Sequence, residues 1–398
     1  MSWPMARIGQ FTHVVTKGTT PTKEQGFADS GINYIKAEAL NGDSSLDLSG
    51  CFFISEDVHQ ALKRSILEDG DVLLTIAGAN IGKCGIVEDR HLPANTNQAV
   101  GIMRVDRQQI NPRFLYYWFK QPRTFRYIQG LNAQAAQPNI NLSMLKNIEV
   151  PVPPISEQKQ IADVISTYDD LIENNRRRIQ LLEQSARLLY KEWFIRLRFP
   201  GHEHVKIKDG VPEGWESVAL SELADFINGF AFKPIHLGDE GLPVVKIPEL
   251  RQGVTNKTPR NPGDMIPEKY HLEDGDLLFS WSGTLAVNVW ASGPALLNQH
   301  LFNVVPYGNI SRAFLMCALR EALVAFANQT VGATMKHIRR SALDNVFVLM
   351  PDDAILSIAE EALNNIYQQI ITLHKQNHKL ADARDLLLPR LMNGEVTV

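Results

Sequence analysis

The stretch from Ile155 to Leu197 reads ISEQKQIADVISTYDDLIENNRRRIQLLEQSARLLYKEWFIRL, and its spacing decides the fold. Apolar residues recur at alternating intervals of four and three, the pattern of a coiled-coil seam. A helix of this length is on the order of 60 Å long at ~1.5 Å per residue. The seam positions are Ile161, Ile165, Tyr168, Ile172, Asn175, Ile179, Leu182, Ala186, Leu189 and Trp193. The spacing therefore predicts one long helix whose apolar stripe needs a partner.

The same spacing returns near the other end of the sequence. Its positions are Ala359, Leu363, Ile366, Ile370, Leu373, Asn377, Leu380, Arg384, Leu387 and Leu391. We expect the two helices to pair antiparallel, with Asn175 opposite Asn377, because a buried asparagine fixes register. Arg384 then lies against Tyr168, where stacking on the ring would tolerate the charge. The alternative is that each helix is buried separately in its own domain.

Shorter landmarks show that the whole chain is a tandem repeat. The pentapeptide LEDGD occurs at Leu67–Asp71 and again at Leu272–Asp276, each time before an apolar run. Further pairs follow in the same order: Trp3 with Trp215, Tyr34–Lys36 with Val244–Lys246, Asn97–Gln98 with Asn298–Gln299, and Ser143–Ile148 with Ser341–Val346. Each half therefore combines a β-rich part of ~150 residues, with some helix, and one long helix.

Length and composition suit a soluble globular protein of two or more domains. The chain has 398 residues and a net charge of −4, which argues against a uniformly basic coat but not against local basic faces. No apolar run approaches the ~20 residues of a membrane span, and the N-terminus lacks the apolar core of a signal peptide. The three cysteines are far apart, so we expect free thiols in a reducing compartment.

Motifs for chemistry are weak, and we expect no catalytic and no metal-binding residue. Ala77–Cys84 resembles a phosphate-binding loop, but Cys84 replaces the Ser or Thr that holds magnesium, and a strand is expected to follow. A strand–turn–strand bending at Gly78 and Gly283 is the better interpretation. The carboxylates of LEDGD fit a turn centred on Gly70 or Gly275 that begins a strand.

Basic and amide residues recur at equivalent places in the two halves. Arg104 to Tyr127 holds six basic residues among aromatics, many of which should be core, and the second half is basic around Lys336–Arg340. Lys and Arg suit phosphate contacts, and Asn and Gln suit base edges. The candidate nucleic-acid contacts are Lys17, Thr19, Thr20, Lys23, Lys36, Lys83, Arg123, Arg126, Gln134, Gln137, Asn139, Lys246, Gln329, Thr334, Lys336, Arg339 and Arg340.

Taken together, these features resemble the DNA-specificity subunit of Type I restriction–modification systems. The most specific piece is the Pro-rich hinge followed by Glu157-Gln158, Ile161 and Ala162; the second copy keeps the proline and Ile-Ala but lacks Glu-Gln. The resemblance implies an α+β fold of two similar, β-rich target-recognition domains joined by two long antiparallel coiled-coil helices with pseudo-two-fold symmetry. We place the domains at residues 1–152 and 200–350, and the spacer helices at 153–199 and 351–398.

The resemblance also implies a function without catalysis in this chain. Each domain would recognise half of a bipartite site on double-stranded DNA, and the helices would set the spacing and dock two methyltransferase subunits, with motor–nuclease subunits added for restriction. S-adenosylmethionine, ATP and Mg²⁺ would be bound by the partners and no cofactor by this chain, in the cytoplasm. Two alternatives remain open: a coiled-coil scaffold that binds only proteins, and a divergent DNA methyltransferase or nuclease.

Overall fold

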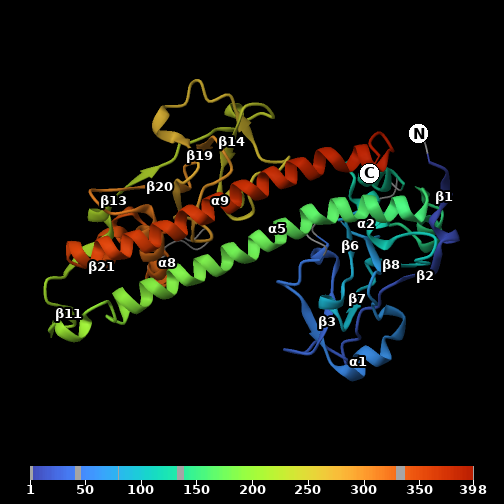
Figure 1. Ribbon diagram of the computed structural model, residues 1–398, viewed down its shortest axis with the longest axis horizontal. Coiled ribbons are helices and arrows are strands. Elements are labelled where there is room, and N and C mark those ends of the chain that lie inside the picture. The colour runs from blue at the N-terminus through green and yellow to red at the C-terminus, as the bar shows by residue number, and fades with distance from the viewer. Residues whose placement is uncertain (1–2, 41–45, 79, 132–138, 329–336, 398) are drawn as a thin grey trace. The chain divides into compact units, whose positions relative to one another are not determined.

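A computed structural model describes residues 3–40, 46–78, 80–131, 139–328 and 337–397, in two compact units. The first unit comprises residues 1–173 and 380–398, and the second comprises residues 174–379. Two long helices, α5 (Ile155–Tyr190) and α9 (Asp353–Met392), each contribute to both units (Figure 1). A π-helical turn, Lys191–Ile195, continues α5.

The first unit contains two sheets and one short antiparallel strand pair. The larger sheet is antiparallel, in the order β2 (Thr12–Lys17), β8 (Val100–Val105), β5 (Val72–Thr75) and β6 (Cys84–Ile86). The smaller sheet has the order β4 (Phe52–Ile54), β3 (Ile32–Ile35) and β7 (Ala94–Thr96), with β3 and β7 parallel. Strand β1 (Met5–Arg7) pairs with β9 (Glu149–Pro151). The short helices are α1 (Glu56–Ala61), α2 (Pro112–Lys120), α3 (Pro122–Gly130) and α4 (Leu142–Lys146).

The second unit repeats this plan. Its larger sheet has the order β13 (Ala224–Asn228), β20 (Leu301–Pro306), β17 (Leu277–Ser280) and β18 (Ala286–Val289). Its smaller sheet has the order β15 (Arg260–Asn261), β14 (Leu242–Val245), β19 (Ala295–Leu297) and β16 (His271–Leu272), with β14 and β19 parallel. Strand β12 (Glu216–Ala219) pairs with β21 (Phe347–Met350), and β10 (Ile207–Lys208) with β11 (Val211–Pro212).

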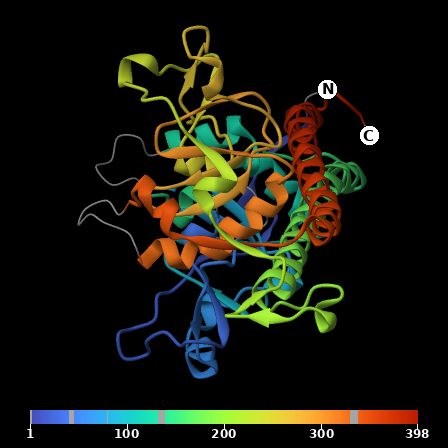
Figure 2. The ribbon, with the colours of Figure 1, turned by 90° about the vertical axis from the view of Figure 1, so that its left-hand side faces the viewer.

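The helices of the second unit complete the correspondence. Helix α8 (Arg312–Asn328) packs on β18 and β20, as α2 packs on β5 and β6 in the first unit. By residue number α8 belongs to the orange part of the ribbon in Figure 2. The remaining short helices are α6 (Leu220–Leu223) and α7 (Ile247–Gln252). The equal order of the larger sheets confirms the tandem repeat expected from the landmarks.

Both LEDGD segments form the expected turn before a buried strand. Gly70 and Gly275 have φ of +80° and +99°, a conformation that favours glycine. Asp71 accepts a hydrogen bond from the backbone N–H of Glu68 at 2.8 Å, and Asp276 accepts one from Glu273 at 2.9 Å. Strands β5 and β17 begin at the next residue, so the duplicated carboxylates serve a structural turn.

The seam residues of the long helices are buried or half-buried, and the two helices pair antiparallel within each unit. In the first unit Ile161 and Ile165 share a core with Leu388 and Leu391, and these side chains are at most 3% exposed. Much of the rest of this core comes from α2 and the larger sheet, so the helices are part of the unit's own core. Burial of both helices in the same core explains how an amphipathic stripe becomes stable here.

In the second unit the same two helices meet through Ile179, Ile370 and Leu373, which form one apolar cluster. Asn175 donates a hydrogen bond from Nδ2 to Oδ1 of Asn377 at 3.0 Å. The register proposed from the two asparagines is therefore confirmed. This hydrogen bond joins one donor and one acceptor of the two amides, which lowers the cost of placing them in an apolar seam.

The expected stacking of Arg384 on Tyr168 is wrong. Arg384 instead donates from Nη1 to Oδ1 of Asp169 at 2.6 Å and also pairs with Asp385. Asp169 further accepts a hydrogen bond from Tyr117 at 3.0 Å and lies 3.5 Å from Nζ of Lys120. A carboxylate next to the seam neutralises the guanidinium, which a ring could only have stacked against.

Candidate nucleic-acid interface

In the first unit several predicted contact residues lie at one edge of the larger sheet. Strand β2 ends at Lys17 beside Gly101, and β5 ends at Thr75 beside Val100, so both strands end on the same side. The segments that leave this edge are Gly18–Lys23, the turn from β5 to β6 with Lys83, and Asn97–Gln98. Asn139 joins them through a bridge to Ala77. The edge thus gathers basic, hydroxyl and amide side chains.

Close backbone contact at Gly18 holds these loops together. A Cβ at Gly18 would lie 2.2 Å from the carbonyl oxygens of Asn97 and Thr96, so only glycine fits. The backbone N–H of Thr19 donates to the carbonyl of Thr96 at 3.0 Å. The loop that begins at Lys17 is therefore fixed to the loop that carries Gln98.

Lys36 belongs to an exposed aromatic cluster beside this edge. Its Nζ lies 3.2 Å from the ring centroid of Phe52 and 5.1 Å from that of Phe27. The two rings are 44% and 48% exposed, although side chains of this size are usually covered. Arg64 Nη2 lies 3.5 Å from Oγ1 of Thr19 and adds a further cation.

Sequence reasoning missed Phe27, Phe52 and Arg64. Phe52 and Lys36 come together only because β3 and β4 pair, and a single sequence does not show which strands are neighbours. The available signal was Phe27 inside the polar loop from Gly18 to Gly31, because surface rings beside cations suit base stacking.

In the second unit the equivalent edge has the same construction and different chemistry. Strand β13 ends at Asn228 and β17 ends at Ser280, again on one side of the sheet. Trp281 donates from Nε1 to Oδ1 of Asn228 at 3.1 Å and to the carbonyl of Gln299 at 3.2 Å. A Cβ at Gly229 would lie 2.3 Å from the carbonyl of Asn298, which repeats the contact at Gly18. The two edges share a scaffold and differ in side chains.

Histidines and aromatic rings surround this second edge. Nδ1 of His300 lies 3.1 Å from Oγ of Ser282, and Ser282 forms a bridge to His337, as Ala77 does to Asn139. Phe230 packs edge-to-face on Phe232. Nζ of Lys269 lies 5.0 Å from the ring centroid of Tyr270, which is also packed on Phe230. Lys246, another predicted contact, is half-buried at the start of α7.

Other predicted contacts lie elsewhere or outside the described residues. Arg123 lines a pocket with Trp3 and Trp118, and Arg126 is exposed on α3. Arg339 is exposed, and Arg340 is 3.6 Å from Asp225. The predicted contacts Gln134, Gln137, Gln329, Thr334 and Lys336 fall outside the described residues.

The basic stretch from Arg104 onward is mostly engaged with carboxylates inside the first unit. Arg104 forms a two-pronged pair with Asp71 at 2.8 Å and 2.8 Å. Lys120 is nearly buried beside Asp169, and burial lowers the pKa of Lys120. Similar pairs link Arg107 with Asp69 and Arg113 with Glu88. In the second unit Arg312 pairs with Asp276 and Arg320 with Glu183. Arg104 and Lys120 are therefore engaged with carboxylates inside the unit, and phosphate contacts from this stretch stay a prediction.

The cysteines are free thiols, as expected. Burial raises the pKa of Cys84 and of Cys317 to about 12, so both are protonated at neutral pH. Cys84 begins β6, the second strand of a strand–turn–strand, where a phosphate-binding loop would require a helix. None of the helices in the described residues is both long and apolar enough to cross a membrane.

The chain is thus a duplicated α+β unit whose equivalent sheet edges carry cations, amides and rings. Comparison with known proteins gives the family. The model of the Type I restriction modification DNA specificity domain matches residues 2–184 and 212–381. The chain therefore belongs to this family, and its function is that of a DNA target-recognition subunit.

The relatives agree along the whole length. The Type I restriction enzyme MjaIX specificity subunit of Methanocaldococcus jannaschii is 26% identical, with 100% of this chain and 94% of the relative covered. The MjaVIII specificity subunit of the same organism is 23% identical, covering 100% and 93%. Among solved structures, the S subunit of a Type I restriction–modification system from M. genitalium has a TM-score of 0.59 at 18% identity, covering 98% and 96%. That likeness concerns the fold, which is the predicted α+β arrangement of two similar domains with two long helices.

Proposed function

We propose that each unit recognises one half of a bipartite DNA target through the edge of its larger sheet. The observation that carries this proposal is the repeated edge. There Lys17 and Asn228 end equivalent strands, and the glycine after each contacts the segment Asn97–Gln98 or Asn298–Gln299. Edges with one scaffold and different side chains suit two half-sites of different sequence. Phosphate contacts from lysines would position the unit, and amides, imidazoles and rings would read bases.

The long helices would set the distance between the half-sites. Half-sites read from one side of duplex DNA lie roughly whole helical turns apart, ~34–36 Å each. A continuous helix transmits distance without a flexible joint, and the pair Asn175–Asn377 fixes which turn of one helix meets which turn of the other.

The outer face of α5 would dock the methyltransferase subunits. Leu181, Leu188 and Ile195 recur every seven residues and are 62%, 60% and 59% exposed. Side chains seven residues apart lie on one side of a helix, so they form a second apolar stripe opposite the seam. A partner helix is the usual cover for such a stripe. Leu386 on α9 is similarly exposed, at 66%.

In this proposal the chain performs no catalytic step and binds no cofactor. Methyl transfer from S-adenosylmethionine to adenine would take place on the two modification subunits, and ATP and Mg²⁺ would be used by motor–nuclease subunits. The exposed edges support a binding role, because their cations and amides can contact phosphates and bases directly.

Mapping methylated adenines tests the proposal. The chain is co-expressed with its cognate methyltransferase subunit in a methylation-free host, and methylated sites are located genome-wide. We expect a split sequence with a fixed gap. Methylation without a split motif, or methyl transfer by the isolated chain, would contradict the assigned role.

Co-purification tests the docking surface separately. Leu181→Glu with Leu188→Glu should abolish co-purification of the methyltransferase subunit, while Met265→Glu, at an exposed position between β15 and β16, should not. DNA binding by the purified variant checks that it is still folded. Full assembly of the double variant would place the docking surface elsewhere.

A further inference from the structure

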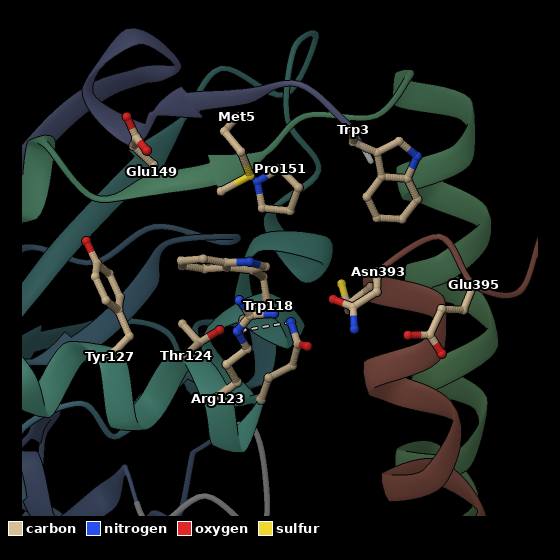
Figure 3. A pocket seen from close by; sticks show the side chains of 12 residues that line it. Trp3, Met5, Trp118, Arg123, Thr124, Tyr127, Glu149, Pro151, Asn393 and Glu395 are labelled. Carbon is tan, nitrogen blue, oxygen red and sulfur yellow. Dashed lines mark hydrogen bonds between the residues drawn. The ribbon is translucent and has the colours of Figure 1, made fainter. Parts of the chain in front are cut away.

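The first unit contains a pocket of about 650 Å³ that the DNA-reading edge does not explain. Trp3, Met5, Trp118 and Tyr127 supply its apolar lining, and Asn393 and Glu395 at the end of α9 stand on another wall (Figure 3). Met5 and Tyr127 are 54% and 47% exposed, which is unusual for side chains of this size. A concave site of this size with an aromatic lining is typical of binding sites.

The internal repeat shows what fills the equivalent place in the second unit. Backbone pairing makes Trp3 and Trp215 equivalent. Trp3 precedes β1, which pairs with β9 just before α5, and Trp215 precedes β12, which pairs with β21 just before α9. Trp215 is covered by Phe199, with ring centroids 4.6 Å apart, and by Phe194 at 5.8 Å. Both phenylalanines follow α5 in the chain and are at most 2% exposed. In the second unit, therefore, an aromatic side chain covers this tryptophan.

The first unit has a smaller residue at the corresponding position. Helices α5 and α9 correspond at an offset of 202 residues. Asn175 pairs with Asn377 across the seam. Gln158 and Glu360 accept hydrogen bonds from the backbone N–H groups of Asn111 and Ser311, the residues just before α2 and α8. At this offset Val396 corresponds to Phe194, and it is only partly buried against the core. The space beside Trp3 is thus left as the pocket.

The charged residues at the opening of the pocket indicate which side chain should accompany an aromatic ring that binds there. Glu149, Glu395 and Arg123 surround the opening, so its formal charge is −1 from two carboxylates and one guanidinium. In the second unit the covering ring, Phe199, follows Arg198 directly. A ring beside a cation would satisfy both the apolar lining and the carboxylates.

We propose that this pocket is a docking site for a segment of a partner polypeptide that carries an aromatic side chain next to an arginine or lysine. The segment would place its ring beside Trp3 and Trp118, as Phe199 lies beside Trp215, and its cation near Glu149 and Glu395. This site is independent of the DNA-reading edge and of the outer stripe of α5, so it stands whether or not those assignments hold.

A peptide copied from the second unit is the test probe. An end-blocked, fluorescently labelled peptide with the sequence RLRFPG, residues 196–201, is titrated with the full-length protein. We expect a dissociation constant on the order of 0.1–1 mM, since one ring and one cation make a small contact. The same peptide with Phe199→Ala should bind at least about tenfold more weakly, because the buried ring supplies most of the free energy.

Protein variants locate the site. Tyr127→Ala and Glu149→Lys, both at exposed positions, should each weaken the peptide about tenfold. The matched control Tyr307→Ala removes a tyrosine of similar exposure from the second unit and should change nothing. Thermal unfolding confirms that each variant is folded.

Four results would overturn the proposal. They are no binding up to about 10 mM peptide, equal binding of the alanine peptide, insensitivity to both pocket variants, and displacement of the peptide by random-sequence duplex DNA. The last result would assign the pocket to nucleic acid.

Discussion

Asp71 illustrates how a carboxylate in a functional-looking motif can belong entirely to the fold. Its side chain is fully buried and accepts from the Glu68 backbone and twice from Arg104. Burial raises the pKa of Asp71, although the Arg104 guanidinium acts in the opposite direction. Both oxygens accept hydrogen bonds inside the protein and the side chain is fully buried, so Asp71 is not accessible to a substrate or metal.

Asp71→Asn should therefore lower the free energy of unfolding and should not act directly on methyl transfer. The asparagine amide has one acceptor oxygen in place of two, and its NH2 group faces the guanidinium of Arg104, which is also a donor. The loss should cost about 1–3 kcal/mol in the free energy of unfolding. Urea unfolding measures it, with Asp69→Asn as the exposed control. Loss of methyl transfer in an assembled complex with unchanged stability and DNA binding would contradict this account.

Lys17 and Lys23 give the residue-scale test of the DNA-reading edge. Both are exposed at the end of β2 and in the loop that follows. If both contact phosphates, Lys17→Ala with Lys23→Ala should weaken all duplexes alike and reduce the slope of log K against log salt by about 0.9 per lysine. Lys159→Ala, exposed on α5, is the control. An unchanged salt slope would remove these lysines from the interface.

At the scale of elements, heptad spacing predicted the paired helices well. Ile161, Ile165 and Leu391 are at most 2% exposed, and Asn175 meets Asn377, because seam geometry follows from helix periodicity alone. The environment of Arg384 could not be predicted in this way. Asp169 stands beside the seam, and Lys120 comes from a different helix, so their meeting depends on how α2 packs on α5.

The candidate site, too, could be predicted from the sequence only where it did not depend on which elements pack together. The loop from Lys17 to Lys23 was recognisable from its composition, and Asn139 lies at the same edge. The ring cluster around Lys36 was missed because it forms across paired strands. Arg104 and Lys120 were expected at a surface and instead pair with carboxylates, since a sequence shows charge but not the distance to the opposite charge.

The group Asp169, Lys120 and Arg384 gives the element-scale prediction. Burial alone would raise the pKa of Asp169, but Lys120 and Arg384 outweigh it and hold that pKa below its ordinary value. Asp169→Asn leaves two nearly buried cations without their carboxylate and should cost about 3–5 kcal/mol. At the offset of 202 residues the second unit has Ile371 and Leu182 at the corresponding positions. Asp169→Ile with Arg384→Leu and Lys120→Met should accordingly recover most of that loss.

The pH dependence of this effect has a definite sign. Because the folded pKa of Asp169 lies below the unfolded value of ~3.9, its stabilisation is complete above that pH and is lost as pH falls through the folded pKa. The difference in unfolding free energy between wild type and Asp169→Asn should be constant above about pH 5 and shrink below about pH 4. A difference that grows on acidification would contradict the assigned charge state.

At the scale of the whole molecule, duplication separates what is kept from what varies. The strand order of the larger sheets, the glycine contacts at Gly18 and Gly229, and the bridges at Ala77 and Ser282 are the same in both units. The side chains at the edges differ, with lysine in one unit where the other has asparagine held by Trp281. A duplicated scaffold with divergent edges is what the proposed recognition of two different half-sites requires.

Lengthening both helices by one heptad tests this separation. Duplicating Ile172–Arg178 in α5 and His374–Leu380 in α9 keeps the seam, because seven residues are two helical turns and both strands of the pair grow together. The insertion adds about 10.5 Å, or about three base pairs at ~3.4 Å each. Methylome mapping should show both half-sites unchanged and the gap wider by about three. Duplication in α5 alone breaks the pairing with α9 and should abolish methylation. An unchanged gap in the double insertion would show that the helices do not set the spacing.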